Sequence, residues 1–114
     1  MELQAEIDGE TLIITASGRR IDAAGAIDFK DEMRKLTEFG PDKVALNLAS
    51  VEFVDSSGLG AVVASMKQLP AGKTLSLLDL TPTVAKVFRL TRMDSVFEIR
   101  KSGEIDWDAW VNAS

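Results

Sequence analysis

The residues that could do chemistry gather in one short stretch, Asp55-Ser56-Ser57-Gly58-Leu59-Gly60, between an apolar strand pattern and an apolar helix pattern. Ser56 and Ser57 place two hydroxyl groups beside the free N–H groups and the positive dipole end of a helix, where an added phosphate is electrostatically tolerated. Gly58 and Gly60 carry no side chains, so another backbone can come close. We call residues 55–60 the Asp55–Gly60 turn, and it predicts an interaction surface.

The alternative for this turn is purely structural. Ser56 or Ser57 would cap the helix, Asp55 would help the turn, and the cap would contribute about 1 kcal/mol and nothing more. Spacing alone does not separate the two interpretations. Two serines and two glycines exceed what a cap requires, and Leu59 between the glycines is oddly placed if it is exposed without purpose. The combination favours an interaction surface.

Known catalytic and nucleotide-binding patterns fit the turn poorly. A phosphate-binding loop needs Gly, four spacers and then Gly-Lys-Ser/Thr, and the chain has no such pattern. A dinucleotide fingerprint starting at Gly58 would have Val63 at its third glycine position, where the helix must pack closely on the strand. A serine hydrolase elbow needs Gly-x-Ser-x-Gly and a base, and the chain has no histidine. We therefore expect binding rather than catalysis, with no cofactor and no metal.

Composition narrows the class of protein further. The chain of 114 residues fits one domain, 1–114, and its 46% apolar and 27% charged residues are ordinary for a globular protein. A formal charge of -5 repels phosphate backbones, so we expect no nucleic acid partner. No apolar run is long enough to cross a bilayer, and the acidic start does not look like a signal peptide. We expect a cytoplasmic protein without membrane insertion.

Hydrophobic alternation predicts the strands. Alternating apolar residues on both sides of Asp8-Gly9 predict an antiparallel hairpin over 3–16. A central strand is expected at 44–48, and the apolar character of the chain continues through Val51, Phe53 and Val54 up to Asp55. Shorter strands are expected at 75–78 and 96–99.

Helical spacing predicts four helices. The first begins at Ala26 and ends before Gly40-Pro41, and the second follows the Ser-Ser-Gly segment and ends before Pro70. The second helix has an apolar stripe, and its other face carries small, uncharged residues: Gly60, Ala61, Ala64 and Ser65. The third has Thr81 as N-cap and Pro82 as first residue. The last follows Ser102 and carries Trp107, Trp110 and Val111 on one side, where the tryptophans are expected to dock the helix rather than bind a ligand.

The predicted element order is ββαβαβαβα, which is an α/β fold with a mixed sheet of four to five strands and about four helices. Helices that follow strands imply parallel pairing through right-handed crossovers. Ligands and partners of open α/β sheets gather outside the carboxyl ends of the strands. The Asp55–Gly60 turn lies at such a junction.

Three segments of the chain resemble the STAS domain family, specifically the anti-sigma factor antagonists of bacterial partner-switching systems. The most specific is Phe53-Val54-Asp55-Ser56-Ser57-Gly58-Leu59-Gly60 after the strand at 44–48. The segment from Gly18 through Ile21-Asp22 before the first helix also matches, although the family often reads Gly-Glu-Leu-Asp where this chain has Gly18-Arg19-Arg20-Ile21-Asp22. Thr81-Pro82-x-Val84 with Phe88 is similar to the family's third helix.

The resemblance implies a phosphorylation site at Ser56, the first serine after the aspartate. It also implies that Asp22 and the Gly58-Leu59-Gly60 segment contact the partner. The partner would be an anti-sigma serine kinase of the GHKL type that also holds a sigma factor, and a PP2C-like phosphatase would reset the switch. ATP would bind the kinase and not this chain.

The sequence therefore predicts an anti-sigma factor antagonist that binds its kinase when unphosphorylated and is released by phosphorylation of Ser56. In this interpretation Ser57 is the helix cap, Asp55 forms the turn, and Gly58 to Gly60 form the approach surface, in a monomer or weak dimer. Two alternatives stay open. One is a STAS subunit of a transporter or other complex that no kinase modifies, and the other is a nucleotide- or small-ligand-binding module.

Overall fold

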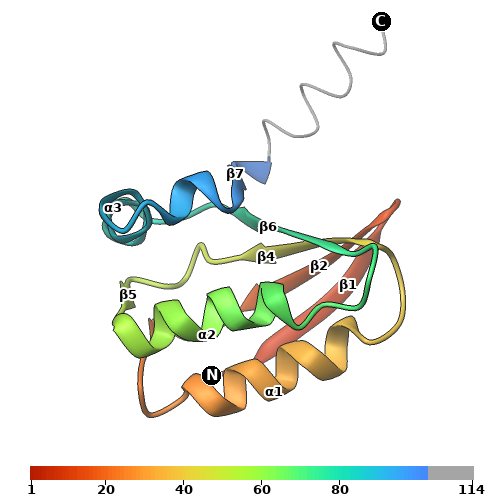
Figure 1. Cartoon of the computed structure of the whole chain (residues 1–114), viewed down its shortest axis with the longest axis horizontal. Coiled ribbons are helices and arrows are strands. Elements are labelled where there is room, and N and C mark those ends of the chain that lie inside the picture. The colour runs from red at the N-terminus through yellow and green to blue at the C-terminus, as the bar shows by residue number, and fades with distance from the viewer. Residues whose placement is uncertain (103–114) are drawn as a thin grey trace, which may run out of the picture.

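Five strands form the central sheet of the computed structural model, which describes residues 1–102 (Figure 1). Their spatial order is β1 (Leu3–Asp8), β2 (Thr11–Ala16), β4 (Lys43–Asn47), β6 (Thr74–Leu78) and β7 (Glu98–Arg100). The β1–β2 pair is antiparallel, and the β2–β4, β4–β6 and β6–β7 pairs are parallel. The predicted mixed sheet and the predicted parallel pairing are both confirmed.

The hairpin between β1 and β2 forms where the turn signal predicts it. Asp8 and Thr11 are the last paired residues, so Gly9 and Glu10 make a two-residue turn. Gly9 has a φ of 61°, in the left-handed region that a tight hairpin turn requires at its first central residue and that glycine adopts at low cost.

Two helices cover one face of the sheet. α1 (Ala26–Thr37) and α2 (Ser56–Lys67) lie side by side against it (Figure 1). α3 (Pro82–Leu90) follows β6, and a short 3-10 turn η1 (Met93–Ser95) leads into β7. The predicted positions of Thr81 and Pro82 at the start of α3 are confirmed, but the Thr81 hydroxyl donates to the carbonyl of Val51, 2.8 Å away, instead of capping the helix.

The core lies between the sheet and these helices. Its fully buried side chains include Ile14, Leu46 and Leu77 from the strands, Met33, Val62, Val84 and Phe88 from the helices. Phe88 meets Phe97 edge to face, with ring centroids 5.9 Å apart, which ties α3 to the chain before β7.

The strand predicted at 44–48 is confirmed as β4, and the apolar residues at 51–54 that follow it belong to a different part of the fold. β4 ends at Asn47, whose side-chain oxygen accepts a hydrogen bond from the Ala49 N–H at 2.9 Å, and the Val51 N–H bonds back to the Leu48 carbonyl at 3.0 Å. These bonds turn the chain. Residues Phe53–Val54 then form β5, which pairs in parallel with β3 (Arg20–Ile21) in a separate two-stranded sheet.

The helix prediction is confirmed in part. Residues 1–102 contain three α-helices, and the predicted last helix with Trp107, Trp110 and Val111 lies outside the described residues. The small residues predicted on the other side of α2 do not all face outward, because Ala61 and Ser65 are buried. Among the described helices, none has both the length and the apolar character to span a bilayer.

Candidate functional site

The small sheet of β3 and β5 brings two distant loops together. Arg20 pairs with Phe53 and Ile21 with Val54, so the chain leaves both strands at neighbouring points, at Asp22 and at Asp55. The Asp55 N–H continues the pairing by donating to the Ile21 carbonyl at 3.3 Å. Two-residue strands therefore place the predicted residues Asp22 and Asp55 side by side.

The Asp55 carboxylate holds both loops. One oxygen accepts the backbone N–H of Gly58 at 2.7 Å, and the other accepts the backbone N–H of Ala23 at 3.1 Å. The first bond satisfies one of the free N–H groups at the start of α2, and the negative charge suits the positive end of the helix dipole. Asp55 is thus the N-cap of α2 and also a clamp on the β3–α1 loop.

The predicted cap at Ser57 is therefore wrong, and the serines are not in a loop. Asp55 is extended, with φ -89° and ψ -176°, and α2 begins at Ser56. An aspartate in that conformation can accept a hydrogen bond from the N–H three residues ahead. The N-cap is therefore Asp55, and both serines follow it inside the helix. Ser56 and Ser57 are exposed first-turn residues, and within residues 1–102 their hydroxyls make no hydrogen bond to protein.

The two glycines have different roles. A Cβ atom on Gly58 would lie 1.9 Å from the Ile21 carbonyl oxygen, so the backbone that approaches Gly58 is the chain's own strand β3. A Cβ atom on Gly60 would meet nothing within 4 Å, and Gly60 is exposed. Of the two glycines that were predicted to let a partner approach, only Gly60 is accessible, because Gly58 is packed against β3.

Leu59 is half-buried and packs against the core, so its side chain is not exposed between the glycines as the sequence suggested. Its N–H donates to the Asp55 carbonyl at 2.8 Å in the first turn of α2. The outward stripe of this helix is instead formed by exposed or half-buried residues at helical spacing: Ser56, Ser57, Gly60, Ala64 and Lys67. We call this set the α2 stripe.

A basic and aromatic cluster borders the site, and it was not predicted from the sequence. The Arg20 guanidinium lies 4.4 Å from the centre of the Phe53 ring and donates to Asp22 at 3.3 Å. Arg19 pairs with Glu52 at 2.8 Å. Arg20 and Phe53 are paired residues of β3 and β5. The sequence could have indicated this contact only if those two-residue strands had been recognised.

The site presents two exposed serine hydroxyls, those of Ser56 and Ser57. Ser56 directly follows Asp55, and a phosphate on its hydroxyl would add about -1.5 to -2 charges next to that residue. In the part of the chain from 1 to 102, no three His, Cys, Asp or Glu side chains are grouped so that they could hold a metal ion. The geometry suits a surface whose charge can be changed.

Comparison with known proteins gives a consistent family. Residues 2–104 match the family model of the STAS domain. A curated relative, the anti-sigma-B factor antagonist of Staphylococcus epidermidis, is 24% identical over 90 residues, which cover 78% of this chain and 83% of that protein. The relative is thus similar to this chain over most of both lengths.

Solved structures share the fold. A putative anti-sigma factor antagonist from Thermotoga maritima has a TM-score of 0.81 at 23% identity and covers 94% of this chain and 92% of its own. The anti-sigma factor antagonist SpoIIAA in its unphosphorylated form has a TM-score of 0.72 at 25% identity and covers 99% of this chain and 98% of its own. SpoIIAA from Bacillus has also been solved in its phosphorylated form, with a TM-score of 0.64 at 23% identity, covering 95% of this chain and 99% of its own.

Proposed function

The chain belongs to the STAS domain family, and we propose that it is an anti-sigma factor antagonist whose binding to an anti-sigma partner is switched by phosphorylation of Ser56. The names of its relatives support the antagonist role. The observation that carries the proposal is the Ser56 hydroxyl itself. It is exposed in the first turn of α2, and Asp55, not a serine, fills the cap position.

In the unphosphorylated state the antagonist binds an anti-sigma serine kinase of the GHKL type and so releases the sigma factor that the kinase holds. The contact surface is the α2 stripe together with Asp22 on the neighbouring loop. Gly60 suits such a contact because its missing side chain lets a partner backbone come close to the helix. Asp55, Gly58 and Leu59 hold the surface in shape from behind.

Phosphorylation ends the contact through charge. The kinase transfers the γ-phosphoryl group of ATP to the Ser56 oxygen, ADP leaves, and the hydroxyl proton passes to the kinase. The new phosphate then carries about -1.5 to -2 charges into a closely packed interface, next to Asp55, where it must be desolvated. A loss of about 2 kcal/mol or more is the usual cost of a disrupted hot spot, which is roughly thirtyfold in affinity.

Dephosphorylation restores the binding state. A PP2C-like phosphatase hydrolyses the phosphoserine and releases inorganic phosphate. The chain itself contributes only the hydroxyl that gains and loses the phosphate, so ATP and catalytic groups belong to the two enzymes.

Incubation of the chain with the GHKL kinase encoded nearest to it and with ATP tests the proposal. The expected result is the mass gain of one phosphoryl group, located on Ser56 by fragmentation, in the native chain and in Ser57→Ala but not in Ser56→Ala. Ser57→Ala is the matched control because it removes a second exposed hydroxyl one residue away. A chain that stays unmodified while it binds an active kinase would overturn the switch and favour a STAS subunit of a complex without kinase control.

A further inference from the structure

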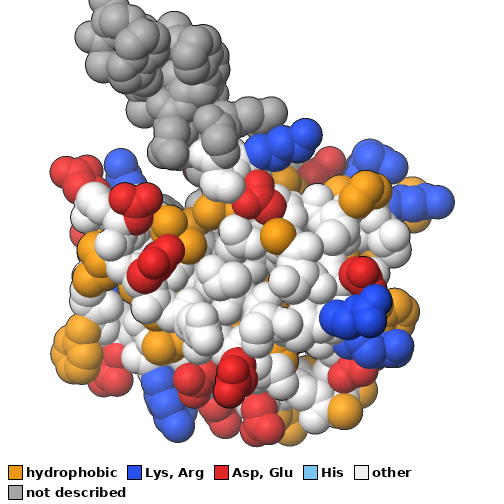
Figure 2. All heavy atoms as spheres, turned by 180° about the vertical axis from the view of Figure 1, so that it is seen from behind, with side chains coloured by type: hydrophobic (Ala, Val, Ile, Leu, Met, Phe, Trp, Pro, Cys, Tyr) orange, Lys and Arg blue, Asp and Glu red, His pale blue; other side chains and the backbone are white. Residues whose placement is uncertain are grey.

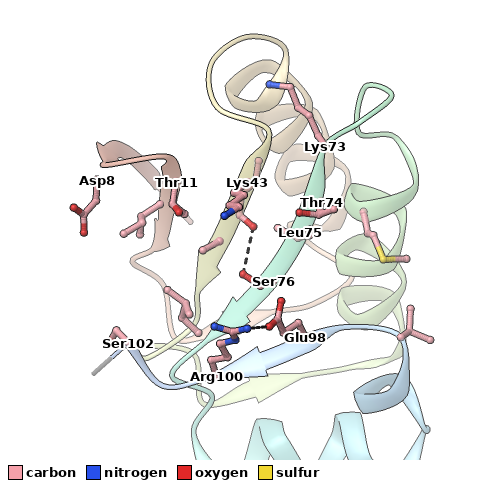
Figure 3. Close-up of a pocket in the computed structure, with 16 residues that line it drawn as sticks. Asp8, Thr11, Lys43, Lys73, Thr74, Leu75, Ser76, Glu98, Arg100 and Ser102 are labelled. Carbon is pink, nitrogen blue, oxygen red and sulfur yellow. Dashed lines mark hydrogen bonds and ion pairs between the residues drawn. The ribbon is translucent and has the colours of Figure 1, made fainter. Parts of the chain in front are cut away.

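Two hollows on the surface of the described residues differ in whether their cations are already paired. The larger one, of about 720 Å³, is lined by residues of β2, β4, β6 and β7 (Figure 3). Its three cations, Lys43, Lys73 and Arg100, all have oxygen partners within residues 1–102, and Figure 3 shows Arg100 paired with Glu98. Seen from behind, much of the middle of the molecule is backbone and uncharged side chains, with charged side chains mainly around the rim (Figure 2).

The smaller hollow, of about 300 Å³, borders the candidate site. It is lined by Arg19, Arg20, Glu52 and Phe53, which belong to β3 and β5 or directly precede them. The backbone fixes the two sides of this hollow, because the Arg19 carbonyl accepts the N–H groups of Glu52 at 2.7 Å and of Phe53 at 3.1 Å. Since β5 leads directly into the Asp55–Gly60 turn, the hollow lies beside the proposed contact surface. We call it the Arg20 hollow.

The two arginines of the Arg20 hollow differ in how their donors are used. Arg19 donates from both Nε and Nη2 to one oxygen of the Glu52 carboxylate, at 3.0 and 2.8 Å. Arg20 donates only from Nε, to Asp22 at 3.3 Å. Within residues 1–102, neither terminal nitrogen of Arg20 has a hydrogen-bond partner in the protein. The terminal fork of the Arg20 guanidinium is therefore open, whereas that of Arg19 is already engaged.

Phe53 holds the open guanidinium in place. The guanidinium carbon of Arg20 lies 4.4 Å from the centre of the Phe53 ring, and the bond to Asp22 fixes the group at a second point. The Arg20 side chain is nevertheless 62% exposed, so its fork can be reached from outside. A guanidinium held in this way loses little freedom when it binds, and its planar fork matches the two oxygens of a carboxylate.

We propose that Arg20 determines partner specificity: its open fork binds an aspartate or glutamate side chain of the anti-sigma partner, and Phe53 positions it for that contact. This inference rests on the proposed function, since the same partner is proposed to bind the α2 stripe and Asp22. A single carboxylate suits the place better than a polyanion, because the Asp22 and Glu52 carboxylates lie next to the fork and the chain has a net charge of -5.

The affinity of the unphosphorylated chain for the anti-sigma kinase tests the contact. Arg20→Ala is expected to weaken binding about tenfold, which is the usual effect of losing a hydrogen bond between charged groups. Arg20→Lys keeps the charge without the fork and is expected to lie between the native chain and Arg20→Ala. Arg20→Glu is expected to bind more weakly than Arg20→Ala, because it places like charges opposite each other.

The matched control removes the neighbouring ion pair. Arg19→Ala combined with Glu52→Ala leaves the net charge unchanged and is expected to alter the affinity by less than about threefold, since both groups are exposed and satisfy each other. Native affinity of Arg20→Ala would overturn the proposal. Arg20→Glu binding at least as tightly as Arg20→Ala would also overturn it, because no acidic group could then face this position.

A double-mutant cycle tests the positioning role of Phe53. Phe53→Leu is expected to weaken binding severalfold in the native background and to have little further effect in the Arg20→Ala background, with unchanged far-ultraviolet circular dichroism in both. An equal loss in both backgrounds would overturn the positioning role, because the ring would then act on the partner or on the fold without Arg20.

The same titrations with Ser56-phosphorylated protein separate this inference from the proposed function. If phosphorylation weakens binding but Arg20→Ala does not, only the role of Arg20 is overturned. If Arg20→Ala weakens binding but phosphorylation does not, the switch is overturned and the Arg20 contact is supported. A native chain that does not bind the kinase would overturn both.

Discussion

Gly58 and Gly60 lie two residues apart in the first half of α2, and alanine at each is predicted to change the stability in opposite directions. Alanine in a helix gains about 1 kcal/mol over glycine at either position. At Gly60 the new methyl group meets nothing within 4 Å, so the gain remains. At Gly58 the same methyl group would lie 1.9 Å from the Ile21 carbonyl oxygen and 2.6 Å from its carbon.

The Gly58 methyl group forces the helix start away from β3. Both colliding atoms belong to backbone, so no side chain can rotate to make room. The movement strains the bonds from Asp55 to Gly58 and Ala23, which are 2.7 and 3.1 Å long in the native chain. Overpacking costs about 1–3 kcal/mol of the free energy of unfolding, and each weakened hydrogen bond costs about 1 kcal/mol. Together these costs outweigh the gain in helix propensity. We expect Gly58→Ala to lose about 2 kcal/mol net.

Urea denaturation followed by circular dichroism measures both variants. Gly60→Ala is expected to raise the free energy of unfolding by about 0.5–1 kcal/mol with an unchanged m value. Gly58→Ala is expected to lower it by about 2 kcal/mol, which corresponds to a Tm decrease on the order of 10 °C. If both variants shifted in the same direction, or if Gly58→Ala were neutral, the assignment of one internal and one external glycine would be refuted.

Three further predictions follow from the same site and its support. Asp55→Ala is expected to lose about 1–2 kcal/mol in thermal denaturation, because it removes both the cap and the clamp on Ala23, and faster amide exchange at Gly58 and Ala23 should accompany the loss. Ser57→Ala is expected to change stability by less than about 0.5 kcal/mol, since the exposed hydroxyl is not the cap; a loss near 1 kcal/mol would restore the capping role. Phe88→Ala is expected to lose about 3–5 kcal/mol in urea denaturation, because the ring is fully buried against Phe97, and a loss below 1 kcal/mol would contradict that packing.

The larger elements could be predicted because their signals are local. The Asp8-Gly9 dipeptide marks the hairpin, and alternating or helical spacing marks each long element in its own segment. The parallel pairing followed from helices that connect successive strands. For the site, the junction of strand and helix at Asp55 was visible for the same reason.

The details of the site depend on contacts between distant segments. β3 and β5 have two residues each, too few to show a period, yet their pairing places Asp22 beside Asp55. Glycine is required at position 58 because the backbone of Ile21, in strand β3, comes too close for a side chain. The choice of cap among Asp55, Ser56 and Ser57 rests on backbone angles, because aspartate and serine are both good caps.

The proposed switch is tested by measuring how tightly the chain binds its anti-sigma kinase. The same titration compares the unphosphorylated protein with the Ser56-phosphorylated protein. We expect phosphorylation to weaken binding by roughly thirtyfold or more. We also expect Gly60→Gln, whose side chain meets nothing within 4 Å at its Cβ, to weaken binding in the unphosphorylated state. Equal affinity of the two forms would contradict the account, because the phosphate would then lie outside the interface that it is proposed to switch.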